Sequence, residues 1–189
     1  MAEFKFSLSA KPILGGVDLR IGDNQIKERN DLAIVSVATP LGGENALAQS
    51  LQDSWNLPLP TPTVASQNSD TFAIRTAPDQ LFLVFPHSQP DAEPVVAHRL
   101  SGTGYTSDQT DVWVVLDIRG PDTIAALERI CPLDAAHMPT NGSARSIMEH
   151  MGTLILRLEE RRFWLFSGSS SAASFLHAVE TSFRNVAEA

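Results

Sequence analysis

Residues 111–134 read DVWVVLDIRGPDTIAALERICPLD and contain the clearest strand and the clearest helix start of the chain. Residues 112–118 are almost continuously apolar, which is typical of a central strand that is buried on both faces. Pro121 suits the first turn of a helix, where its missing N–H costs little, and Asp122 adds negative charge near the positive end of the helix dipole. The residues that follow predict an amphipathic helix, which ends before Pro132 and buries Ile124, Leu127 and Ile130.

Short strands and helices alternate on both sides of this segment. Upstream, the apolar patterns predict a strand, a helix and a hairpin at residues 32–37, 44–55 and 71–85. Downstream, they predict a hairpin at residues 153–166 and a last helix at residues 172–186, for which residues 169–171 offer a serine cap. A further helix begins near residue 95, and residues 143–151 fit a helix or a strand equally well.

The order of these elements predicts the fold class. A strand, a helix and a hairpin follow one another twice along the chain, which indicates an α+β domain whose antiparallel sheet carries helices on one face. A ferredoxin-like split arrangement fits this order. We expect residues 31–189 to form this single domain. Residues 1–30 are poorly periodic and are expected to form loops or an extended arm, which either packs on a partner or is a frayed terminus.

Composition narrows the class of protein. The chain has 189 residues and is 43% hydrophobic, enough for one domain with a real core. Its net charge of -8 disfavours binding to nucleic acid, because phosphate groups are repelled. Only 19% of the residues are charged, so part of the surface is expected to be neutral polar, apolar or covered by a partner. No apolar run is long enough to span a bilayer and no signal peptide is evident, so we expect a cytoplasmic protein without a membrane role.

The sequence offers few residues for chemistry. It contains no dinucleotide-binding glycine motif, no phosphate-binding lysine motif and no nucleophile elbow. Cys131 is the single cysteine and follows a helix end whose negative partial charge disfavours a thiolate, so we expect a small buried residue. Asp134 and His137 form a pair at metal-ligand spacing, but a structural metal site normally needs four ligands. Trp113 and Trp164 are expected in the core, and Trp55 in the core or at an interface.

Residues 111–134 resemble the corresponding segment of sarcosine oxidase gamma subunits, in which a buried strand leads to a Gly-Pro helix start and then to Cys-Pro-Leu-Asp. Residues 77–84, which read APDQLFLV, resemble another strand of that family. The resemblance extends over about residues 30–186. It departs from the family at Ala135, where leucine is usual, and in residues 136–142, which lack the expected phenylalanine.

The resemblance implies a non-catalytic gamma subunit that is similar in fold to the folate-binding domain of aminomethyltransferases. It implies alpha, beta and delta partners, with the large alpha subunit as the main contact. The whole complex would demethylate sarcosine to glycine, pass the one-carbon unit to tetrahydrofolate and release hydrogen peroxide. FAD, FMN, NAD and zinc would be held by the other subunits. Because no aminomethyltransferase catalytic aspartate can be matched, we predict no catalytic, cofactor-binding or metal-binding residue in this chain.

Two other functions fit the same sequence. A stand-alone folate-binding protein related to aminomethyltransferases would need a carboxylate for the pterin ring, and Asp117 and Asp134 are the candidates by position. The more common role for Asp117 is that of a polar residue at the end of a strand, and for Asp134 that of an acidic residue in a turn. The chain could instead be the equivalent subunit of a related complex that demethylates another N-methyl amine.

Overall fold

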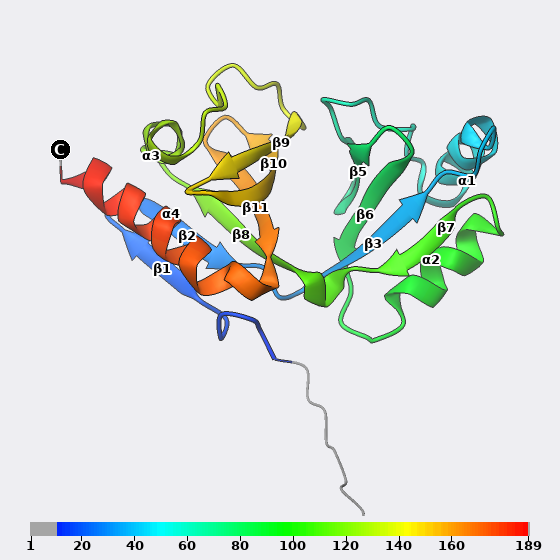
Figure 1. Ribbon diagram of the computed structural model, residues 1–189, viewed down its shortest axis with the longest axis horizontal. Coiled ribbons are helices and arrows are strands. Elements are labelled where there is room, and N and C mark those ends of the chain that lie inside the picture. The colour runs from blue at the N-terminus through cyan, green and yellow to red at the C-terminus, as the bar shows by residue number, and fades with distance from the viewer. Residues whose placement is uncertain (1–10, 189) are drawn as a thin grey trace, which may run out of the picture.

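The computed structural model describes residues 11–188, which form two antiparallel sheets and four α-helices (Figure 1). The six-stranded sheet has the order β1 (Asp18–Ile21), β2 (Asn24–Glu28), β8 (Trp113–Arg119), β11 (Arg162–Gly168), β10 (Met151–Glu159) and β9 (Ser143–Met148). The five-stranded sheet has the order β4 (Ser66–Asn68), β5 (Thr71–Ala77), β6 (Gln80–Pro86), β3 (Leu32–Ala38) and β7 (Tyr105–Asp108). The helices are α1 (Glu44–Trp55), α2 (Ala92–Leu100), α3 (Thr123–Ile130) and α4 (Ala172–Ala187).

The two halves of the chain repeat one arrangement. The first half runs β3, α1, β4, β5, β6, α2, β7, and the second runs β8, α3, β9, β10, β11, α4. The central order β7-β3-β6-β5 is that of a ferredoxin-like sheet, and β2-β8-β11-β10 repeats it with β2 in the place of β7. The α+β class, the split arrangement and the twofold strand-helix-hairpin pattern predicted from the sequence are therefore confirmed.

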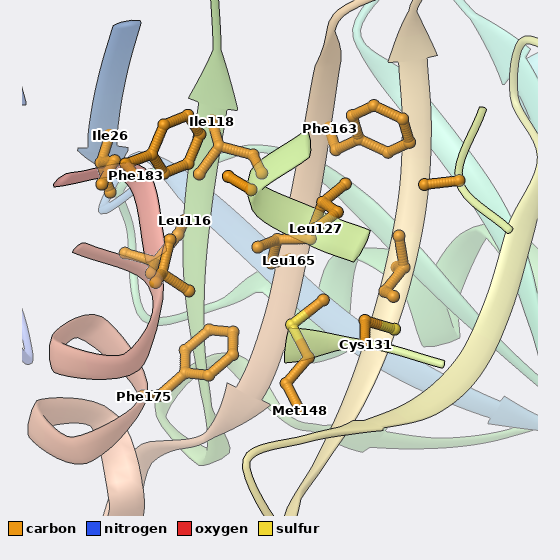
Figure 2. Packing of buried hydrophobic residues seen from close by; sticks show 14 of the residues in the cluster. Ile26, Leu116, Ile118, Leu127, Cys131, Met148, Phe163, Leu165, Phe175 and Phe183 are labelled. Carbon is orange, nitrogen blue, oxygen red and sulfur yellow. The ribbon is translucent and has the colours of Figure 1, made fainter. Parts of the chain in front are cut away.

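Helices cover the outer face of each sheet, and the inner faces pack on one another. Along β8, Val114, Leu116 and Ile118 belong to the core under α3 and α4, part of which Figure 2 shows. Val115 points the opposite way and joins the core between the sheets. A third core lies between the five-stranded sheet and the helices α1 and α2. The prediction that helices cover one face is correct for each sheet taken by itself. The apolar residues on the other face of β8 allow the second sheet to pack there.

Most predicted elements appear within a few residues of their expected positions. Residues 143–151, which fitted helix or strand, form β9 and a turn before β10. Cys131 is 6% exposed, and its Sγ lies 3.2 Å from the Ser146 Oγ, so the expectation of a buried residue is confirmed. Trp164 is in the core as predicted, while Trp113 and Trp55 pack half-buried against core clusters. Among residues 11–188, no helix is both long and apolar enough to cross a membrane.

The expectation of loops or an extended arm before residue 31 is wrong for residues 18–28. These residues form the β1–β2 hairpin, and β2 pairs with β8 at the edge of the six-stranded sheet. Ile26 is fully buried and Ile21 nearly so, but the three apolar residues of this polar segment, Leu19, Ile21 and Ile26, are too few to show a periodicity. Residues 1–10, the rest of the expected arm, lie outside the described residues.

One buried asparagine attaches the hairpin to the start of α3. Asn24 is 1% exposed, its Nδ2 donates to the Asp122 carboxylate at 2.8 Å, and its Oδ1 accepts from the Asp122 backbone N–H at 3.0 Å. Gly120 has φ +137°, and a Cβ at this position would lie 2.4 Å from Asn24 Oδ1. The glycine before Pro121 is therefore required for the close approach of the two segments.

We expect Gly120→Ala to lower the free energy of unfolding by at least about 2 kcal/mol, because it combines an unfavourable φ with a clash against a buried side chain. Urea denaturation followed by circular dichroism measures this. Gly152→Ala is the matched control, since no atom lies within 4 Å of a Cβ built there. Equal stabilities of the two variants would contradict the attachment described here.

Candidate functional site

A cluster of charged side chains around the buried Asp117 lies where the core between the sheets ends. Asp117 on β8 is 6% exposed and points toward the side of the six-stranded sheet that faces the other sheet. The Arg162 Nη2 donates to the Asp117 Oδ2 at 2.7 Å, and the Trp164 Nε1 donates to the same oxygen at 3.1 Å. Strand pairing explains this arrangement, because Trp164 lies directly opposite Asp117 and Arg162 is two residues away on the same face.

A second arginine completes the cluster from the other side. Arg29 follows β2, and its backbone N–H donates to the Val115 carbonyl at 2.9 Å. Its guanidinium lies 4.7 Å from the centre of the Trp164 ring and 3.7 Å from the Asp117 Oδ2. The same guanidinium makes two hydrogen bonds to Asp31, at 2.7 and 2.8 Å.

These contacts set the electrostatics of the cluster. The hydrogen bonds from Arg29 hold the pKa of Asp31 below its usual value, which outweighs the opposing effect of burial. The hydrogen bond to Asp117 raises the pKa of Arg162, which remains charged at any pH at which the protein is folded. The Asp117 carboxylate already accepts from one guanidinium and one indole and lies beside a second guanidinium. Both carboxylate oxygens therefore bind partners within the fold, and the 6% exposed side chain offers little surface to a pterin ring.

Asp134, the other candidate carboxylate, lies in the loop after α3 and shares no partner with Asp117. Its two oxygens lie 2.9 and 2.8 Å from the His137 Nδ1, and the side chains are 67% and 84% exposed. The hydrogen bond from His137 lowers the pKa of Asp134. Residues 11–188 contain no group of three or more histidine, cysteine and acidic side chains placed to hold a metal ion. Because both side chains are exposed, the pair makes its contact at the surface.

Arg157 is a buried cation that the sequence reading did not single out. It is 9% exposed, and its guanidinium donates to the backbone carbonyls of five residues: Ala135, Ala136, Met138, Glu159 and Glu160. The guanidinium also lies 5.6 Å from the centre of the Phe163 ring. Arg157 therefore holds the loop after α3 against the β10–β11 turn. Its signal in the sequence is a single arginine within the otherwise apolar run LILRL, on the same face of β10 as Ile155.

We expect Asp117→Asn to destabilise the protein by about 2 kcal/mol, because two guanidiniums lose their shared anion. Thermal and urea unfolding measure this effect. Glu159→Gln is the control, since Glu159 bonds the same Arg162 from an exposed position and its loss should cost no more than about 0.5 kcal/mol. An Asp117→Asn variant as stable as the wild type would show that the carboxylate has no structural role.

No known family profile and no curated protein matches this sequence. Among solved structures, the chain is similar to a chain of the heterotetrameric sarcosine oxidase from Corynebacterium sp. U-96, with a TM-score of 0.75 and 19% identity over 88% of this chain and 86% of the other. It is also similar to the glycine cleavage system aminomethyltransferase T from Bartonella henselae, with a TM-score of 0.56 and 16% identity. That match covers 80% of this chain and 44% of the aminomethyltransferase. At these identities the similarity shows a shared fold.

Proposed function

We propose that this chain is the non-catalytic gamma subunit of a heterotetrameric sarcosine oxidase. The complex oxidatively demethylates sarcosine to glycine, transfers the one-carbon unit to tetrahydrofolate and produces hydrogen peroxide. In this proposal the chain works in the cytoplasm with alpha, beta and delta subunits, chiefly the large alpha subunit. FAD, FMN, NAD, zinc and tetrahydrofolate are held by those other subunits.

The observation that carries the proposal is the extent of the structural similarity to the sarcosine oxidase chain. The match covers nearly the same share of both chains, 88% and 86%, so the two are of comparable length. This extent supports the assignment to a subunit of comparable size, rather than to one domain of a larger enzyme. The aminomethyltransferase, by contrast, has more than half of its length outside the match.

The geometry of the charged clusters supports a non-catalytic role. Asp117 is neutralised by Arg162 and Arg29 within the fold, and Asp134 is bonded to His137 at the surface. A general base or a pterin-binding carboxylate needs an oxygen edge that faces a cavity and is open to the substrate. Neither aspartate presents one, which favours the subunit over the stand-alone folate-binding protein.

We expect the tagged chain, purified gently from its own cells, to carry larger chains with it and to show flavin absorption bands. The purified material should release hydrogen peroxide when sarcosine is added, because the large subunits hold the flavin chemistry. A tag-only purification from the same cells is the control. A colourless chain that purifies alone and binds tetrahydrofolate would contradict the proposal and favour the stand-alone protein. Peroxide release with another N-methyl amine, and none with sarcosine, would assign the chain to a related demethylating complex.

We expect His137→Ala to leave the turnover of the assembled complex within about twofold of wild type, since its only described partner is the exposed Asp134. The measurement is sarcosine-dependent peroxide release per flavin. Normalising to flavin separates turnover from assembly. An assembled His137→Ala complex without turnover would show that the chain contributes to catalysis.

A further inference from the structure

A groove of about 410 Å³ opens at the polar end of the six-stranded sheet. It lies between the β1–β2 hairpin, the end of β8 and the β10–β11 turn, and four arginines line it: Arg20, Arg119, Arg161 and Arg162. The turn is fixed to the end of β8 by a hydrogen bond from the Gly120 N–H to the Arg161 carbonyl, at 3.2 Å. The walls of the groove are therefore parts of the sheet itself.

Strand pairing aligns the arginines on one face. Arg20 lies opposite Gln25, Gln25 opposite Arg119, and Arg119 opposite Arg162. Residues directly opposite one another in a sheet share a face, so the guanidiniums of Arg20, Arg119 and Arg162 lie in one row. Arg119 and Arg162 are on the neighbouring strands β8 and β11. Arg162 is neutralised by Asp117 and by Glu159, which lies opposite it on β10.

Arg119 is held in position without being neutralised. Its Nε donates to the Gln25 Oε1 at 2.8 Å, and Gln25, which is 7% exposed, donates in turn to Asp18. This bond uses only one of the five N–H groups of the guanidinium, and within residues 11–188 its terminal amino groups have no hydrogen-bond partner. A buried amide thus orients a guanidinium whose outer edge faces the groove.

In this groove the arginines without an acidic partner outnumber the carboxylates without a basic partner, which favours the binding of a small anion. Across the described part of the chain, Arg20, Arg119 and Arg161 have no carboxylate within 4 Å, although the chain carries a net charge of -8. Three carboxylates also line the groove, Asp23, Glu159 and Glu160, of which only Glu159 pairs with an arginine of the lining, Arg162. The two unpaired carboxylates, Asp23 and Glu160, would repel a dianionic phosphate more strongly than a singly charged carboxylate.

We propose that this groove docks an acidic peptide segment of a partner subunit, with a carboxylate side chain bound to the free edge of Arg119 and to Arg20. The identity of the partner rests on the proposed function, whereas the binding chemistry does not. An arginine edge and a carboxylate match in two parallel hydrogen bonds. An open groove with a charged lining suits a peptide segment, because sites for small molecules are mostly concave and apolar.

The test uses the isolated full-length chain and a fluorescein-labelled hexapeptide of one glutamate among serines, with binding followed by fluorescence anisotropy at low and moderate salt. We expect the wild type to bind the peptide, and the double variant Arg20→Gln/Arg119→Gln to bind about tenfold more weakly. Arg145→Gln removes an exposed arginine of β9 and should bind as the wild type does. Circular dichroism melting checks that each variant is folded.

Three results would overturn the proposal: no binding by the wild type, equal binding by the double variant, or stronger competition by inorganic phosphate than by the unlabelled one-glutamate peptide. Purification from the native cells separates this inference from the proposed function. If flavin-containing chains co-purify with the wild type but the wild type does not bind the peptide, the subunit assignment stands and the proposal for the groove is wrong. If the chain binds the peptide but purifies without flavin, the proposal for the groove stands and the subunit assignment is wrong.

Discussion

The contact on which the two-sheet arrangement depends is the packing of Trp164 across the gap between the sheets. Its ring lies 5.1 Å from that of Phe72 on the opposite sheet, in an edge-to-face arrangement, and it is 4% exposed. Burying an indole also buries its N–H, which must find an acceptor. Asp117 supplies that acceptor, and the buried carboxylate then requires the guanidiniums of Arg162 and Arg29.

Because Trp164 needs Asp117 and Asp117 needs the two guanidiniums, the inner face of the six-stranded sheet has an apolar part and a polar part. The part under the other sheet is apolar and includes Val115, Leu154 and Phe166. The part beyond it is polar, and its charges are either paired, as around Asp117, or held apart, as at Arg119. The paired cluster has a structural role, and the unpaired arginines are the ones available to a partner. This division agrees with a subunit that contributes surfaces rather than chemistry.

Much of the architecture could be predicted because its signals are local. The apolar run before Gly120-Pro121 predicted β8 and α3, and the two apolar runs on either side of the turn at residues 159–161 predicted the β10–β11 hairpin. The β1–β2 hairpin was missed because its stability comes from Asn24 and from pairing with β8, about 90 residues away in sequence. Asp117 was selected as a candidate from its place at a strand end, but Arg29 and Arg162 were not, since nothing local links them to it.

The sequence by itself determined the α+β class, most elements and the repeated strand-helix-hairpin order, because periodicity and turn residues act over short distances along the chain. Only the tertiary structure decided that the strands form two sheets packed face to face, that Asp117 is neutralised, and that Arg20 and Arg119 share one groove. These outcomes depend on which strands become neighbours. Strand pairing fixes that through contacts between residues far apart in the sequence, which local patterns do not encode.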